Sequence, residues 1–201
     1  PFDWNTWMWW ISLTALSNTT AVVLISIAVA MLGVPLFGAT GDGGSTSIAL
    51  QVAMAPLFFL AGSVVGAGQW IVVRGEILRA GWWVLATAAG WMAGYLWSYL
   101  LFPPGSDTSS IALLLLPWVM FGLASGLCQW LILRHHYHRA GLWVPVATLA
   151  MAVGATGWLV GGLMGGAFSW IFAAAFSGWF LLRILPPKRL WPESRSGKDE
   201  G

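Results

Sequence analysis

Residues 126–143 read GLCQWLILRHHYHRAGLW and repeat the pattern of residues 66–83, which read GAGQWIVVRGEILRAGWW. Aligned from Gly62 and Gly122, both copies follow G-x-x-x-G-x-x-Q-W-x-x-x-R, then four residues, then R-A-G-x-W. Agreement at so many positions without a gap indicates an internal repeat. We therefore expect the two segments to adopt the same structure at two places in the fold.

A third and more divergent copy lies near the end of the chain. It reads SGWFLLRILPPKRLW, with Trp179 four residues before Arg183, and Arg189 and Trp191 further on. Gly178 stands where the other copies have glutamine. Because each copy ends an apolar segment, the three predict an all-α fold of three helical hairpins repeated in parallel.

The composition indicates a membrane protein. Of the 201 residues, 58% are hydrophobic and only 8% are charged, whereas a soluble domain carries about 25% charged residues. So few charges cannot cover a surface that faces water, and we expect an integral membrane protein. The chain also has 16 tryptophans, many near the ends of apolar segments, where indoles favour the bilayer interface.

Six apolar segments are long enough to cross a bilayer, which takes roughly 20 helical residues. Their approximate ranges are 20–37, 48–73, 82–102, 111–133, 142–164 and 167–185. Residues 1–185 are thus predicted to form one transmembrane domain, and the polar residues 186–201 a cytoplasmic tail. Gly165 and Gly166 are predicted to separate the fifth and sixth spans.

The region before the first span is rich in tryptophan and in short polar side chains. It begins PFDWNTWMWW, where Trp9 and Trp10 are expected to lie at the membrane interface. Asn18, Thr19 and Thr20 follow, and their side chains predict an N-terminal helix cap at this point. A small polar site is the alternative interpretation of these three residues.

The basic residues predict the orientation in the membrane. With six spans, all nine Lys and Arg residues fall on one side, whereas the opposite loops carry Asp42 and Asp107 and no basic residue. Loops rich in Lys and Arg stay in the cytoplasm, so both termini are predicted to be cytoplasmic. The nine are Arg74, Arg79, Arg134, Arg139, Arg183, Lys188, Arg189, Arg195 and Lys198.

Glycines spaced four residues apart predict close helix packing. In lipid, helices associate through van der Waals contact rather than the hydrophobic effect, and a flat glycine groove lets two backbones approach. We expect this role for Gly62, Gly66, Gly90, Gly94, Gly122, Gly126, Gly157 and Gly161.

Each repeat carries Trp and Arg four residues apart on one helix face, so the indole is expected to lie under the guanidinium. The arginines that flank the turns have two interpretations. They bind an anionic lipid headgroup or the acidic loop of a partner, or they serve only topology and anchoring. The candidate contacts are Arg74, Arg79, Arg134, Arg139, Arg183 and Arg189.

Gln69 and Gln129 are polar groups about one turn inside the predicted cytoplasmic boundary, where an amide needs a partner. The first interpretation is an interhelical hydrogen bond, between the two glutamines themselves around the repeat axis. The alternative is ligation of a buried group, including the magnesium of a chlorophyll-type pigment. The adjacent Trp70 and Trp130 would then stack on the macrocycle.

Several chemistries have no matching residues. No predicted span contains Lys or His, which excludes a retinal Schiff base and haem held by histidine. The single cysteine, Cys128, excludes an internal disulfide and a CxxC metal or redox site. His135, His136 and His138 are expected in a solvated turn. We find no paired carboxylates or nucleophile motif, so we predict neither an enzyme nor a metal site, and no nucleic-acid partner.

The strings GQWIVVRGEILRAGWWV and CQWLILRHHYHRAGLWV resemble a group of small bacterial polytopic membrane proteins of the cyanobacterial and filamentous green bacterial type. Their recurring signature is QWxxLR…RAGxW, and the resemblance covers the second to fifth spans, roughly half the chain. It implies about six spans and no assigned activity. The occurrence among phototrophs favours a bioenergetic membrane.

These observations leave three functional hypotheses. The first is a non-catalytic accessory subunit of the bacterial cytoplasmic or photosynthetic membrane, which packs against a larger photosynthetic or respiratory complex. Its grooves would hold lipid, a chlorophyll-type pigment, a carotenoid or a quinone. The second is a small-solute transporter or channel, which requires a polar path at the midplane. The third is a lipid-binding membrane protein without partners.

Overall fold

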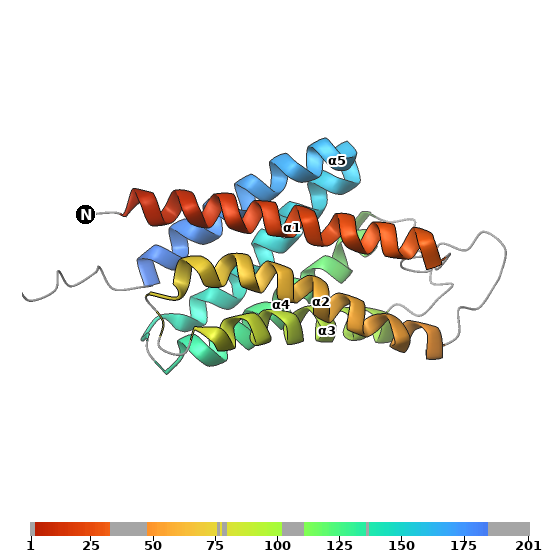
Figure 1. The fold of residues 1–201 in the computed structure, drawn as a ribbon, viewed down its shortest axis with the longest axis horizontal. Helices are drawn as coiled ribbons and strands as arrows, with labels where there is room; N and C mark the ends of the chain where they lie inside the picture. The colour runs from red at the N-terminus through yellow and green to blue at the C-terminus, as the bar shows by residue number, and fades with distance from the viewer. Residues whose placement is uncertain are drawn as a thin grey trace, which may run out of the picture.

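The computed structural model describes residues 3–32, 48–75, 77, 80–101, 111–135 and 137–184. Its elements are α1 (Trp4–Leu32), α2 (Ile48–Val73), α3 (Gly81–Leu101), α4 (Ile111–Leu133), the short 3₁₀ turn η2 (Ala140–Leu142) and α5 (Trp143–Ile184). A kink divides α5 into two, so six helices are long and apolar enough to cross a membrane (Figure 1).

The first helix begins well before its predicted start. α1 runs from Trp4, so the predicted span that started at Thr20 and the predicted cap at Asn18–Thr20 are wrong. The cap is Asp3: its Oδ1 accepts a hydrogen bond from the Thr6 backbone N–H at 3.1 Å, and its Oδ2 accepts one from the Thr6 hydroxyl at 2.6 Å. A carboxylate that satisfies free N–H groups fixes a helix start.

The break between the last two spans also differs from the prediction. Gly162 has φ +55° and ψ −142°, outside the helical region, whereas the predicted break at Gly165 and Gly166 lies within the helix that follows. A positive φ is costly for residues with a Cβ, so glycine is the residue that can turn the chain here. The two halves of α5 therefore fold back on each other.

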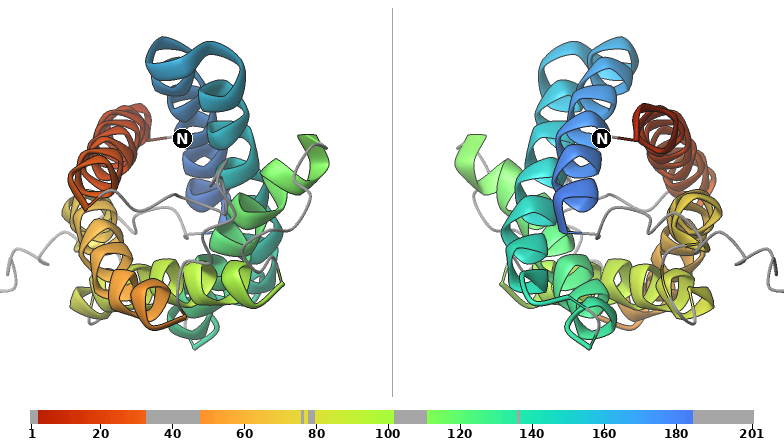
Figure 2. Two further views of the ribbon diagram at one scale, coloured as in Figure 1. Left: turned by 90° about the vertical axis from the view of Figure 1, so that its right-hand side faces the viewer. Right: turned by 90° about the vertical axis from the view of Figure 1, so that its left-hand side faces the viewer.

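The helices form a closed ring in chain order. α1 packs against α2, α2 against α3, α3 against α4 and α4 against α5, and α5 returns to α1. Viewed along the bundle, they surround a common centre (Figure 2). The closure is held by a hydrogen bond in which the Trp7 indole N–H donates to the Ala175 carbonyl at 3.0 Å.

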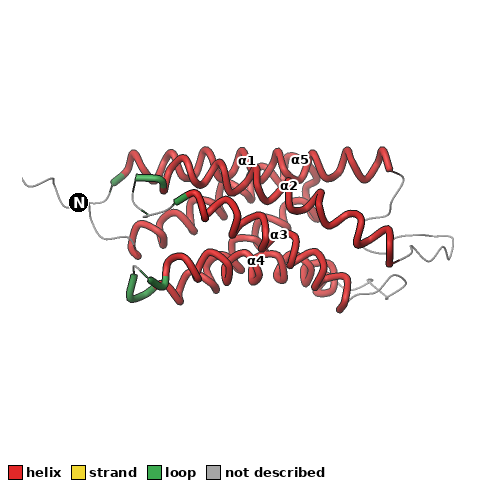
Figure 3. The backbone as a smooth tube through the Cα atoms, turned by 60° about the horizontal axis from the view of Figure 1, so that its bottom comes forward, coloured by secondary structure: helices red, strands yellow, loops and turns green. Residues whose placement is uncertain are grey.

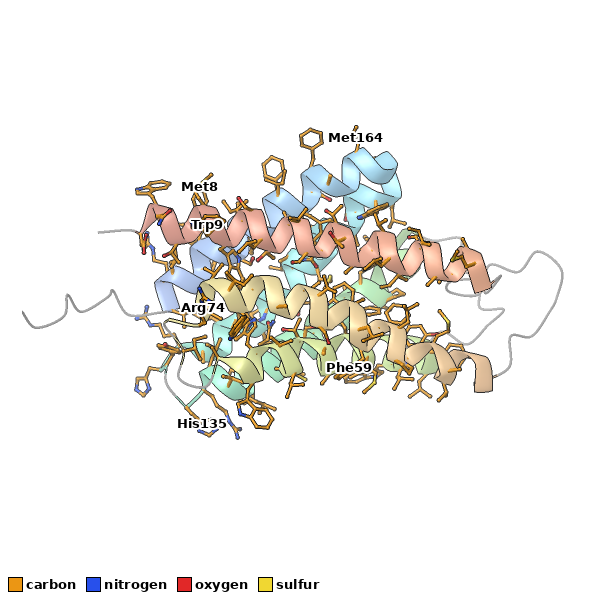
Figure 4. All side chains as sticks on the ribbon, viewed as in Figure 1. Met8, Trp9, Phe59, Arg74, His135 and Met164 are labelled. Atoms are coloured by element: carbon orange, nitrogen blue, oxygen red, sulfur yellow. The ribbon has the colours of Figure 1, made fainter. Side chains whose placement is uncertain are left out.

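One end of the bundle gathers the start of α1, the α2–α3 turn, the α4–α5 turn and the end of α5 (Figures 1 and 3). Arg74 and His135 lie at this end in Figure 4. The predicted acidic loop residues, Asp42 and Asp107, lie outside the described residues. We call this end the basic end, after its described arginines Arg74, Arg134, Arg139 and Arg183.

The outer surface of the ring is apolar. Large hydrophobic side chains are exposed on all five helices, and Met8 and Met164 point away from the bundle in Figure 4. Such a surface suits hydrocarbon rather than water. It agrees with a multi-pass membrane protein whose polar groups are turned inward.

Glycines bring equivalent helix pairs into contact at equivalent places. A Cβ added to Gly62 of α2 would lie 2.8 Å from the Ala88 Cα of α3. A Cβ added to Gly122 of α4 would lie 2.6 Å from the Thr148 Cα of α5. Both distances are shorter than those that real Cβ atoms make. The two backbones can therefore approach this closely only because glycine has no side chain at these positions.

The second glycine of each copy behaves similarly. A Cβ on Gly66 would meet the Val84 Cα at 2.8 Å, and one on Gly126 would meet the Val144 Cα at 3.1 Å. The spacing in sequence between each glycine and its partner is the same in both copies. The glycines that recur in the sequence thus make equivalent helix–helix contacts in the two copies.

The other predicted glycines do not all take part in packing. Gly90 and Gly94 of α3 face α4, with a Cβ on Gly94 reaching 2.6 Å from the Phe121 Cα, and Gly157 faces the second half of α5. A Cβ on Gly161 would meet no atom within 4 Å. The packing prediction is therefore wrong for Gly161, which lies beside the kink and faces open space.

Gly122→Ala is expected to destabilise the bundle by about 1–3 kcal/mol, because the added methyl overpacks the α4–α5 contact. Gly161→Ala is the matched control and should be neutral or slightly stabilising, because it adds helix propensity without a clash. The measurement is the free energy of unfolding in mixed micelles. Equal effects of the two substitutions would contradict the packing argument.

Candidate functional site

The two glutamines of the repeat accept hydrogen bonds from the two tryptophans that follow the turns. The Trp83 indole N–H donates to Gln69 Oε1 at 2.9 Å, and the Trp143 indole N–H donates to Gln129 Oε1 at 2.7 Å. An indole N–H only donates, so the amide oxygen must face it in both pairs. Each bond ties the end of one helix to the start of the next across a turn at the basic end.

The two pairs are joined into one network. Gln129 Nε2 donates to Gln69 Oε1 at 3.1 Å, which confirms the predicted bond between the glutamines, and to the Thr87 hydroxyl at 2.9 Å. The Thr87 hydroxyl donates in turn to the Trp83 carbonyl at 2.8 Å. Gln69 Oε1 already accepts two hydrogen bonds, from Trp83 and Gln129, so a pigment magnesium would have to displace one of them to bind it.

A third tryptophan, Trp10 of α1, completes an aromatic triad with Trp83 and Trp143. Its ring centroid lies 6.5 Å from that of Trp83 and 6.1 Å from that of Trp143, and the latter two are 5.9 Å apart. Its indole N–H donates to the Ser177 hydroxyl at 3.2 Å. Trp10 thus meets the third copy of the repeat, next to Gly178, where the other copies have glutamine.

The sequence predicts Trp10 at the membrane interface and does not predict its place in the triad, where its side chain is 1% exposed. A signal was available: Trp10 and Thr14 have the spacing of Trp83 and Thr87. That pattern lies at the opposite end of the chain from the third copy. For this reason it was not recognised as part of the repeat.

A cavity of about 50 Å³ lies at the centre of the ring, beneath the triad. Side chains from all five helices line it, including both halves of α5, and none of the described lining residues is charged. Its apolar lining includes Trp91, Met151 and Trp170. Its polar lining consists of Thr14, Asn18, Gln69, Thr87, Ser125, Gln129 and Ser177.

Three of the lining groups have no hydrogen-bond partner within the described part of the chain. They are the hydroxyls of Thr14 and Ser125 and the indole N–H of Trp170. Their residues are 5%, 6% and 3% exposed. Buried polar groups are almost always paired, so three unpaired ones around a single space require an explanation.

The arginines of the repeat lie over the tryptophans, as predicted. The guanidinium carbon of Arg74 is 5.6 Å from the Trp70 ring centroid, and that of Arg134 is 5.4 Å from the Trp130 ring centroid. The divergent copy keeps the contact, with Arg183 4.8 Å from Trp179. Arg139 is exposed in the turn. Arg79 and Arg189 lie outside the described residues.

A surface groove of about 320 Å³ runs between α1 and α2 near the basic end. Among its described lining residues Arg74 is the charged one and Thr6 is polar, and the others are apolar. In Figure 4, Arg74 and Trp9 lie at the same end of the molecule. The remaining described lining residues are Trp9, Leu13, Ile71 and Val72.

Three further hydroxyls inside the spans bond within their own helices. The Ser63 hydroxyl donates to the Phe59 carbonyl of its own helix at 2.9 Å, and Thr148 and Thr156 do the same to carbonyls four residues back. This arrangement satisfies a hydroxyl within lipid without a partner helix. The polar groups that face one another are therefore those around the central cavity.

Comparison with protein-family models, with curated proteins and with solved structures finds no match for this chain. The resemblance to small bacterial polytopic proteins stays a prediction. Within the described residues, no group of three or more His, Cys, Asp and Glu side chains is placed to hold a metal ion. Function is therefore inferred from the geometry of the glutamine–tryptophan network, the cavity and the groove.

Gln129→Leu and Trp143→Phe are each expected to lower the free energy of unfolding by about 1–3 kcal/mol, because each leaves a buried polar partner unpaired. The double variant should be less destabilised than the sum of the two by about 1 kcal/mol, because the unpaired group is removed as well. The measurement is a double-mutant cycle in mixed micelles. Gln129→Leu combined with Ser63→Ala, which shares no contact with it, serves as the additive control. Strict additivity for Gln129 and Trp143 would show that their bond contributes nothing.

Proposed function

We propose that the protein is a non-catalytic accessory subunit of a bacterial cytoplasmic or photosynthetic membrane, which packs against a larger bioenergetic complex. The observation that carries this proposal is that the repeated polar residues, Gln69 and Gln129 with their tryptophans, are engaged with one another inside the ring. Groups already bonded in this way are suited to hold a rigid shape. They are poorly suited to proton transfer or nucleophilic attack.

We further propose that the chain consists of three helical hairpins repeated in parallel. The recurring glycine contacts of α2 with α3 and of α4 with α5 support this arrangement. The meeting of Trp10 with Ser177 supports a third unit formed by the end of α5 and the start of α1. Because this third unit would combine the last and the first helical segments of the chain, its formation would close the ring.

The proposed orientation puts the basic end, and with it both termini, in the cytoplasm. The described arginines all lie at that end, which is the distribution that the positive-inside rule favours. The cytoplasmic leaflet is also the one that carries anionic lipid in quantity. The arginines would then face the charge that they are able to bind.

Lipid is the ligand best supported for the groove between α1 and α2. The apolar wall of Leu13, Ile71 and Val72 suits an acyl chain, and the guanidinium of Arg74 stands where an anionic headgroup would lie. The Trp70 ring beneath Arg74 holds the guanidinium in place. A carotenoid or quinone would use the apolar wall alone and would gain nothing from the charge.

Arg74→Gln is expected to weaken the binding of phosphatidylglycerol by about fivefold or more, because a charge-assisted contact at the membrane surface is lost. Arg134→Gln is the matched control, since it removes an equivalent charge on an equivalent tryptophan but leaves the groove intact. The measurement is the number of lipid adducts retained in native mass spectrometry. Equal losses in the two variants would indicate general surface attraction and not a site.

The accessory role predicts that the protein extracted from its native membrane in mild detergent migrates with larger subunits. Visible absorbance of the same fraction would indicate a pigment-bearing complex, whereas large partners without colour would indicate a respiratory or other colourless one. A solitary species without chromophore would contradict the accessory role. That result would favour a lipid-binding protein without partners.

One observation favours the transporter or channel as a second candidate. The central cavity gathers seven polar side chains from helices distant in sequence. A solute that crosses the membrane needs such groups. The ligand that fits this cavity can be argued separately.

A further inference from the structure

We propose that the central cavity is a binding site for small, uncharged molecules that both donate and accept hydrogen bonds, of which water is the smallest. This proposal goes beyond the accessory role and does not depend on it. It concerns the interior of the ring, whereas the lipid groove and any partner surface lie outside.

The unpaired groups point to a guest. The Thr14 hydroxyl comes from α1, the Ser125 hydroxyl from α4 and the Trp170 indole N–H from the second half of α5. All three residues line the same cavity. A buried hydroxyl or indole that bonds nothing is unfavourable, and in a bilayer no bulk water is at hand to compensate. A guest that hydrogen-bonds to these groups reduces that cost.

The chemistry of the lining defines the guest. The hydroxyls of Thr14 and Ser125 donate or accept, whereas the indole of Trp170 only donates, so the guest must present at least one acceptor. Among the residues that the structure describes, no charged side chain lines the cavity. An ion would lose its hydration there without a counter-charge, which is strongly unfavourable at low dielectric. The guest is therefore neutral.

The size of the cavity limits the guest further. A buried water needs roughly 10–15 Å³ of such space, so about 50 Å³ holds a few waters or a neutral solute of three or four heavy atoms. A pigment, a quinone or an acyl chain does not fit. The site differs in this respect from the larger groove beside Arg74.

Aromatic rings bound the cavity along the bundle axis. Trp143 of the triad lines it toward the basic end. Trp91, about two turns further along α3 than Trp83, lines it toward the other end and contacts Phe121 edge to face at 5.7 Å between centroids. Trp91 and Phe121 both belong to the buried apolar core of the bundle.

The first experiment detects water at the site. The full chain, labelled with ¹⁵N-tryptophan, is placed in phosphatidylcholine nanodiscs, and magnetisation transfer from water to each indole proton is measured. Trp170→Phe and Trp83→Phe assign the two signals needed. Transfer to the Trp170 proton and none to the Trp83 proton, which is bonded to Gln69, is the expected result. Absence of transfer at Trp170, or equal transfer at both, would overturn the proposal.

The second experiment uses formamide and formate, which match in size and differ in charge. Formamide is expected to shift the Trp170 indole resonance saturably and to leave that of Trp83 in place, while formate leaves both unchanged. An equal effect of formate would overturn the argument for a neutral guest. Water contact without any formamide shift would limit the site to water and overturn its extension to larger solutes.

Two variants test whether the cavity hydroxyls bind a guest molecule or are simply left unpaired. Thr14→Val and Ser125→Ala are expected to weaken formamide binding by about two- to tenfold, the loss of one hydrogen bond, and to lower thermal stability. Ser63→Ala is the control, because its hydroxyl bonds a carbonyl of its own helix away from the cavity. If both variants were more thermally stable than the unsubstituted protein, the Thr14 and Ser125 hydroxyls would have no hydrogen-bond partner there. That result would contradict the proposal.

Discussion

The fold depends on a simple constraint: an indole N–H inside a bilayer can only donate, and leaving it without an acceptor is unfavourable. Gln69 and Gln129 supply that acceptor for Trp83 and Trp143. Because each bond crosses a turn, it fixes how one helix enters the next. The bond between the two glutamines then fixes how the two helix pairs meet. Four side chains thus determine the arrangement of most of the ring.

Close backbone approach makes these short-range bonds possible. An amide side chain reaches only a few ångströms, so α4 must come near α2 and α3 for Gln129 to contact Gln69 and Thr87. The glycines of α2, α3 and α4 allow this approach. Packing and hydrogen bonding are therefore not separate contributions here. In α2 and α4 the glutamine lies one or two turns closer to the basic end than the glycines of the same helix.

Local spacing made part of this structure predictable. The six long apolar helices, the glutamine pair and the arginine–tryptophan contacts all follow from residues a few positions apart or from the repeat. The start of α1 was not predictable in this way. Its cap at Asp3 lies in a tryptophan-rich segment, which is typical of the membrane interface and not of the start of a span. The break at Gly162 was predicted at the wrong residues because several glycines lie close together there. Only the backbone torsion angles show which of them turns the chain. The cavity was not foreseeable, since Thr14, Ser125 and Trp170 are remote in sequence and become neighbours only when the ring closes.

Ring closure also has a consequence for biosynthesis. The bond between Trp10 and Ser177 joins residues 167 positions apart, so α1 leaves the ribosome long before its last partner exists. At roughly 5–20 residues per second, the delay is about 10–30 s. Throughout that time the polar stripe of Thr14, Ser17 and Asn18, buried in the finished protein, faces the bilayer or the insertion machinery. The nascent chain therefore depends on whatever shelters its first helix until the last one arrives.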